Sequence, residues 1–165
     1  MNVSPDFSPS IKIMKPYFVL SSVFYLLSIF SLFFIDPNQS LHNFNIVAWV
    51  HLYMLGFVMM AIFSAMAQLG PVIVEKKHYN VNIFKYVWIF LSIGLALMLI
   101  GFTQSTPFLL YGGVFVLIAM STYAIEFLLT LKNASRNTTI TKAMKMSNFF
   151  LLAGILSGLL MALSY

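Results

Sequence analysis

The stretch from Phe44 to Val74 contains no Asp, Glu, Lys or Arg and reads FNIVAWVHLYMLGFVMMAIFSAMAQLGPVIV. A helix needs about 20 apolar residues to cross ~30 Å of hydrocarbon, so this run is long enough to span a membrane. Four further apolar segments are also long enough to span a membrane, and the chain is 61% hydrophobic and only 8% charged. This composition excludes an ordinary water-soluble domain.

The five segments predict an all-α membrane protein, with residues 1–165 forming a single transmembrane domain of five helices. We place the helices near residues 17–35, 46–69, 83–101, 107–131 and 147–164. A membrane β-barrel would instead show short segments of alternating hydrophobicity. Gly70 and Pro71 are expected to end the second helix.

The positive charges predict the orientation of the chain. All nine lie before the first helix, between the second and third, or between the fourth and fifth: Lys12, Lys15, Lys76, Lys77, Lys85, Lys132, Arg136, Lys142 and Lys145. The positive-inside rule places these segments in the cytoplasm, with the N-terminus inside and the C-terminus outside. We therefore expect a multi-pass protein of a bacterial inner membrane, whose charge serves topology and contact with anionic lipid rather than nucleic acid.

His51 is the histidine that hydropathy places inside the membrane. An ionisable side chain in hydrocarbon is costly unless it has a partner, so it marks a candidate functional site. The orientation puts His51 roughly 8 Å below the outer surface, at 1.5 Å of helix rise per residue. Neutral imidazole is a common ligand of metals and of heme iron. His78 is expected on the opposite side of the membrane, where it cannot share a site with His51.

The helix around His51 predicts an apolar binding surface. Met54, Leu55 and Val58 follow it at three, four and seven residues, which places them on one face of an α-helix. This face has no carboxylate, so it suits a porphyrin better than a hydrated divalent ion. The chain has no cysteine, which excludes thiolate and iron–sulfur ligation.

The segment AWVHLYMLGFVMMAIFSAMAQLGPVI resembles the second transmembrane helix of the heme-copper oxidase subunit I superfamily. His51, Gly56, Gly70 and Pro71 match that pattern, in which a histidine near the outer end ligates the low-spin heme. The resemblance implies that His51 holds heme b. Those oxidases have many more helices, and later ones supply histidines for copper and a second heme. This chain departs from them there, so the resemblance implies heme binding without a binuclear centre.

A second axial ligand is also expected, because the partner histidine of that family is missing. Met98 and Met161 are predicted near the depth of His51, and His/Met ligation is a known heme arrangement. We expect the protein to form a homodimer, in which His51 or His42 of the second copy can complete the coordination instead. The competing interpretation of His51 is a hydrogen bond between helices.

These features predict one-electron transfer or heme-linked sensing. No constellation of acid, base and nucleophile indicates an independent catalytic reaction. Two alternatives remain. One is a non-catalytic subunit or assembly factor of a respiratory oxidase complex. The other is a Cu(I)-handling protein using His51 with thioethers, which favour Cu(I), from Met54, Met59, Met60 and Met66.

Two further features lie outside the predicted heme site. Glu126 falls near the cytoplasmic end of the fourth helix, where we expect it to pair with Lys85 or Lys132. Gly154 and Gly158 form a GxxxG spacing in the last helix. This spacing permits close helix crossing, either between two copies of the chain or within one bundle.

Overall fold

The computed structural model describes residues 7–36, 38, 40, 43–132, 134 and 138–163, apart from the side chain of Ala162. Within these residues every regular element is helical. The elements are α1 (Ile11–Leu32), α2 (Phe44–His51), η2 (Leu52–Met59), α3 (Met60–Val74), η3 (Val81–Ile83), α4 (Phe84–Thr103), α5 (Pro107–Lys132) and α6 (Thr139–Leu163). α2, η2 and α3 follow one another directly as a single long helix, of which η2 is a π-helical portion.

Five of the helical stretches are long and apolar enough to cross a membrane, which confirms the predicted number of spans. The bounds differ most at α1 and α6, which begin several residues earlier than predicted. Their first two turns contain Lys12 and Lys15 in α1, and Lys142 and Lys145 in α6. Lysine stems run along apolar surface while the ammonium group stays in water, so a helix can begin before its hydrocarbon-spanning part.

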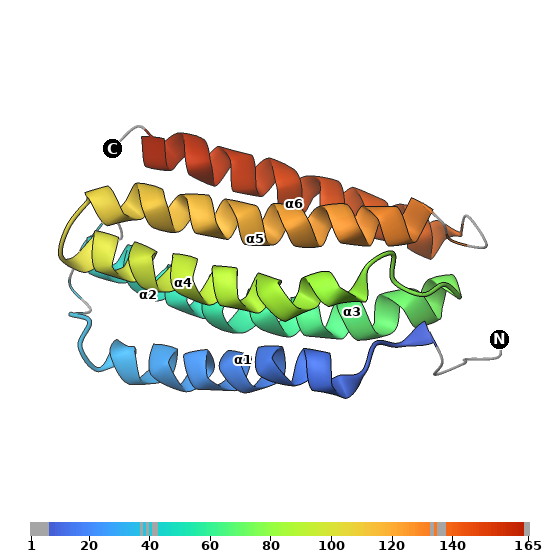
Figure 1. Cartoon of the computed structure of the whole chain (residues 1–165). Coiled ribbons are helices and arrows are strands. Elements are labelled where there is room, and N and C mark those ends of the chain that lie inside the picture. Colours follow the sequence, from blue (N-terminus) through green and yellow to red (C-terminus); the bar gives the residue numbers. More distant parts are fainter. Residues whose placement is uncertain are drawn as a thin grey trace.

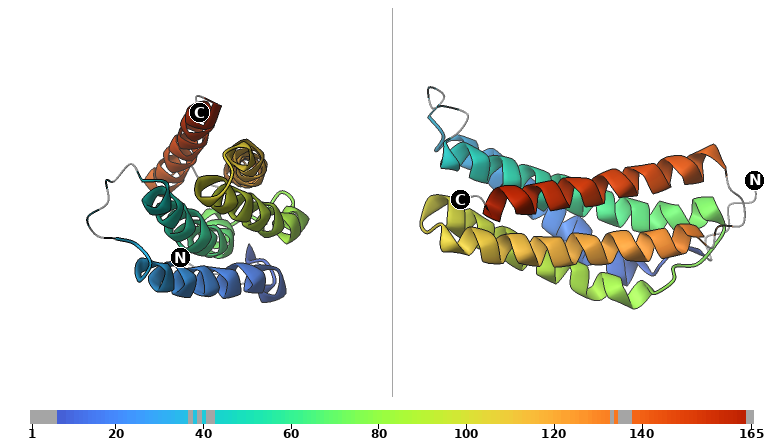
Figure 2. Two further views of the ribbon diagram at one scale, coloured as in Figure 1. Left: turned by 90° about the vertical axis from the view of Figure 1, so that its left-hand side faces the viewer. Right: turned by 90° about the horizontal axis from the view of Figure 1, so that it is seen from above.

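The helices run alternately up and down a bundle (Figure 1). α1 and α6 both begin at the end of the bundle where α3 is followed by α4 and where α5 ends. The described lysines therefore lie at one end of the bundle, which we call the basic end, and we call the opposite end the far end. Figure 2 shows α1 and α6 on opposite sides of the bundle, with the other helices between them.

The core lies among α1, α3, α4 and α5. The rings of Phe63 and Tyr123 stack with centroids 3.8 Å apart, and Tyr17 donates a hydrogen bond to the carbonyl of Phe84 at 2.7 Å. α6 packs mainly on α5 and has only 11% of its apolar span buried, compared with 50% for α5. Among the described residues, α6 is therefore the least buried of the five spans.

Pro71 does not end the second span, which corrects the prediction. α3 continues to Val74 and closes at Glu75, whose φ of 54° is left-handed, with the N–H of Lys76 donating to the carbonyl of Pro71 at 3.0 Å. Proline has no N–H, so the carbonyl four residues earlier, that of Ala67, receives no helical hydrogen bond. The helix continues because another group supplies that hydrogen bond, as described below.

α4 and α5 cross closely at glycines. A Cβ atom on Gly112 would lie 2.6 Å from the backbone nitrogen of Met98, and one on Gly94 would lie 2.8 Å from that of Val116. Neither backbone can move aside cheaply. Glycine at these positions is therefore a packing requirement, as is common where membrane helices approach each other.

Gly112→Ala is expected to destabilise the bundle by about 1–3 kcal/mol, because the added methyl group overpacks the crossing. The matched control is Gly158→Ala, where an added Cβ meets no atom within 4 Å among the described residues. Reversible denaturation in mixed micelles measures both. Equal stability of the two variants would contradict the close crossing.

Candidate functional site

A pocket lies beside α6, between that helix and the second span. Its volume is about 410 Å³, it is partly open, and its lining is almost entirely apolar. This size lies within the ~300–1,000 Å³ typical of small-molecule sites. The lining residues are Val50, His51, Met54, Leu55, Met98, Gly113, Val116, Met120, Phe150, Leu151, Gly154, Ile155, Gly158 and Leu159. We call this space the His51 cavity.

His51 is the ionisable residue of the cavity lining, and its ring is held in place. Nδ1 lies 2.8 Å from the carbonyl oxygen of Val47, and the ring centroid is 4.8 Å from that of Phe102. A carbonyl only accepts hydrogen bonds, so Nδ1 carries the proton and donates it. In a neutral imidazole this leaves a lone pair on Nε2, which is how metal-binding histidines are usually prepared.

The cavity brings together four of the residues predicted around the heme: His51, Met54, Leu55 and Met98. Val58 does not line it. The prediction assumed α-helical spacing, but residues 52–59 are π-helical. The i→i+5 bonding of a π-helix puts more residues in each turn, so the residue seven positions after His51 turns away from it. Single π-bulges are often found at functional sites.

The candidate second ligands separate in space. Met98 lines the cavity, and its side chain lies across Gly112. Met161 is 63% exposed and is not part of the lining. His42 lies outside the described residues. Met120, which the sequence analysis did not single out, lines the cavity opposite α6.

Glycines form much of the α5 and α6 walls of the cavity. A Cβ on Gly154 or Gly158 would meet no atom within 4 Å in the described structure, and one on Gly113 would just touch Leu159 at 3.9 Å. Within this protomer the GxxxG pair therefore faces open space rather than a close helix crossing. Its effect is to widen the cavity.

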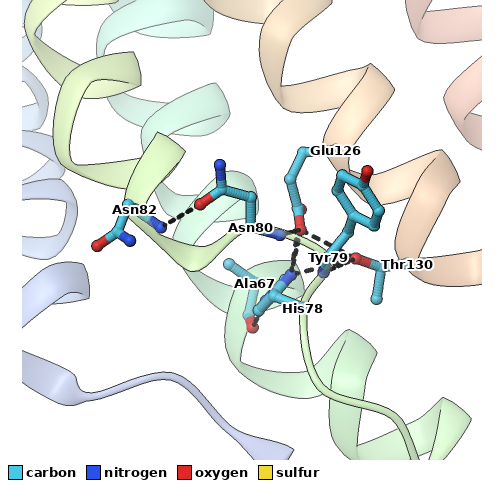
Figure 3. Close-up of polar contacts among 7 residues, drawn as sticks. All are labelled: Ala67, His78, Tyr79, Asn80, Asn82, Glu126 and Thr130. Carbon is cyan, nitrogen blue, oxygen red and sulfur yellow. Dashed lines mark hydrogen bonds and ion pairs between the residues drawn. The ribbon is translucent and has the colours of Figure 1, made fainter.

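A second polar cluster lies at the basic end, where the loop between α3 and α4 contacts α5 (Figure 3). Nδ1 of His78 is 3.0 and 3.1 Å from the two carboxyl oxygens of Glu126. Thr130 donates to Oε1 of Glu126 at 3.0 Å, and the N–H of Asn80 donates to it at 3.3 Å. The side chains of His78 and Glu126 are 2% and 0% exposed.

His78 also supplies the hydrogen bond that Pro71 removes from α3. Its Nε2 lies 2.7 Å from the carbonyl oxygen of Ala67, so Nε2–H donates to that oxygen. With Nε2 protonated, Nδ1 shares one further proton with the Glu126 carboxyl. The donors from Thr130 and Asn80 favour the ionised carboxylate, and therefore an imidazolium–carboxylate pair.

The partner of Glu126 is thus His78, not Lys85 or Lys132 as predicted. The sequence analysis placed His78 on the opposite side of the membrane from His51, gave it no partner, and did not single out Thr130 or Asn80. Two signals pointed to the cluster: a proline that frees the Ala67 carbonyl, and the four-residue spacing of Glu126 and Thr130 on one helix face. In the described residues, no three His, Asp or Glu side chains gather as a metal site. The ionisable side chains of this cluster are the pair His78 and Glu126.

Comparison with known protein families, curated proteins and solved structures finds no match to this chain. The interpretation of the His51 cavity and of the His78–Glu126 pair therefore depends on their own chemistry alone. One is an apolar cavity with a histidine prepared for ligation, and the other is a buried, fully hydrogen-bonded ion pair.

The single substitution His78→Leu should destabilise the protein by about 3–5 kcal/mol, because it leaves the Glu126 carboxylate buried without a counter-charge. The double variant His78→Leu/Glu126→Leu removes both charges and should recover part of that loss. Denaturation of the two variants and of Glu126→Leu completes a double-mutant cycle. Strictly additive effects would contradict the pair.

Proposed function

We propose that the protein binds heme b in the His51 cavity and serves one-electron transfer or heme-linked sensing. The observation that carries this proposal is the hydrogen bond from Nδ1 of His51 to Val47, which leaves Nε2 as a ligand atom at an apolar cavity. When bound, heme supplies an iron that cycles between ferric and ferrous states. The protein's part is to ligate, to orient and to exclude water.

The lining supports this cofactor over a hydrated ion. Apart from His51, the residues around the cavity are aliphatic, aromatic, glycine or methionine, which suit a flat hydrophobic ring. Gly154 and Gly158 leave the space that side chains would otherwise fill. Met98 is our proposed second ligand, because it comes from α4 to the same cavity.

We further propose that the basic end is cytoplasmic and the far end extracytoplasmic, in a bacterial inner membrane, as the distribution of lysines favours. His51 is the last residue of α2, whose start at Phe44 marks the far end. An electron partner would then approach from the outer side. The largely exposed α6 offers a surface for a homodimer or for a larger respiratory complex.

A Cu(I) site is the second candidate, and one observation favours it. Three methionines, Met54, Met98 and Met120, line the cavity together with His51. Thioether and imidazole groups are suitable ligands for Cu(I). The methionines Met59, Met60 and Met66, considered from the sequence, are not among the lining residues.

The purified protein, expressed with ample heme, should show Soret and α bands in reduced-minus-oxidised spectra. His51→Ala should lose both bands while remaining folded by circular dichroism. A colourless, folded wild-type protein with no metal would contradict the proposal and favour the subunit or assembly role. Copper without heme, by elemental analysis, would instead support the second candidate.

The second ligand is tested by a matched pair of substitutions. Met98→Leu should turn a low-spin heme spectrum into a high-spin one, because leucine cannot ligate iron, whereas Met161→Leu should leave the spectrum unchanged.

Gly158→Leu should fill the cavity and lower heme occupancy about tenfold or more, while Leu156→Phe on the exposed side of α6 should not. The opposite result for either pair would contradict this placement.

A further inference from the structure

The loop of residues 75–80 closes the basic end through the buried ring of His78. Both ring nitrogens meet acceptors, the Ala67 carbonyl and the Glu126 carboxylate. Two loop N–H groups are also bonded to α5, that of Tyr79 to Thr130 at 3.1 Å and that of Asn80 to Glu126. The chain on either side of His78 is exposed, at Lys77 and Tyr79. A small loop movement would therefore carry the ring from the core into water.

The pair as it stands is neutral overall and holds one proton between Nδ1 and the carboxylate. On the elements packed against the pair, Tyr123 of α5 lies three residues before Glu126, and Tyr17 of α1 donates its hydroxyl to the Phe84 carbonyl. α3 and α4 contribute the Ala67 carbonyl and the Phe84 ring, whose centroid is 4.7 Å from that of His78. Glu75, Lys76 and Lys77 belong to the loop itself. In the described structure no lysine forms an ion pair with Glu126 that would hold its charge if His78 left.

We propose that His78 and Glu126 form a proton-binding site that releases this loop when it takes up a second proton. The proton comes from water and converts the carboxylate to a neutral acid beside the imidazolium. Only an O–H bond forms in the protein, and no other covalent bond changes. A positive charge would then be buried without a counter-charge, which is strongly unfavourable. Moving His78 into water removes that penalty, and mild acid protonates a free histidine.

A buried hydroxyl without a hydrogen-bond partner lies on the same helix as Glu126. The hydroxyl oxygen of Tyr123 is buried and has no hydrogen-bond partner in the described part of the chain. Tyr123 lies three residues before Glu126 on α5, so the two side chains share a helix face. Buried polar groups without partners are rare and call for an explanation. A protonated Glu126 that has lost His78 would find an acceptor there.

The absence of native cysteine allows a direct test with single reporter thiols. Ala67→Cys lies under the loop and Leu95→Cys lies in the core of α4, and both wild-type side chains are 0% exposed. A water-soluble maleimide labels each, and each rate is divided by that of the same protein unfolded at the same pH. From neutral to mildly acidic pH, the Ala67→Cys ratio should rise about ten- to a hundredfold, the range expected for losing charged hydrogen bonds, and that of Leu95→Cys should stay constant.

Glu126→Gln mimics the protonated acid. In this background the Ala67→Cys thiol should label rapidly at neutral pH and gain nothing in acid, whereas Thr130→Val, which keeps the pair, should retain the acid response. Hydrogen exchange of the Tyr79 and Asn80 amides checks the opening in the unsubstituted chain. Three outcomes would overturn the proposal: labelling of Ala67→Cys that does not change with pH, equal acceleration of both thiols, or an acid response that persists in the Glu126→Gln background.

Discussion

The structure depends on a requirement of the bilayer: hydrocarbon offers no hydrogen-bond partner, so a polar group within it is costly unless the protein supplies one. Several side chains meet this requirement by donating hydrogen bonds to backbone carbonyls along the length of the bundle. Trp49 on the second span donates to Ser28 of α1, Tyr17 of α1 donates to Phe84, and Asn148 of α6 donates to Ala124 of α5. These hydrogen bonds join helices whose apolar surfaces alone would pack equally well against lipid.

The two described histidines meet the same requirement with opposite results. His78 uses both nitrogens, one on the carbonyl freed by Pro71 and one on Glu126, so its bonding capacity is filled. His51 uses only Nδ1, on a carbonyl of its own helix, and Nε2 has no hydrogen-bond partner in the described structure. A filled group holds structure together, whereas an unfilled one at a cavity is available to a ligand. This difference is why we propose binding chemistry for His51 and conformational chemistry for His78.

Much of the fold was predictable because its main determinant, hydrophobicity over about 20 residues, is local in the sequence. The same holds for the grouping of His51, Met54 and Leu55, which one helix supplies. Val58 was misplaced because π-helical bonding depends on packing and leaves no periodic signature. The partnership of Glu126 with His78 was missed for a different reason. Hydropathy treats a loop as solvent-exposed and does not register that proline creates an acceptor which a nearby side chain can fill.

The two partners of the ion pair, His78 and Glu126, are synthesised at different times. His78 is synthesised only a few residues after Pro71, so the gap in α3 can be closed by its own hairpin before later helices exist. Glu126 follows much later, within a helix whose insertion a carboxylate makes less favourable. It then meets an imidazole already fixed by its other nitrogen. The early half of the protein thus contains the partner of Glu126 before the late half is made.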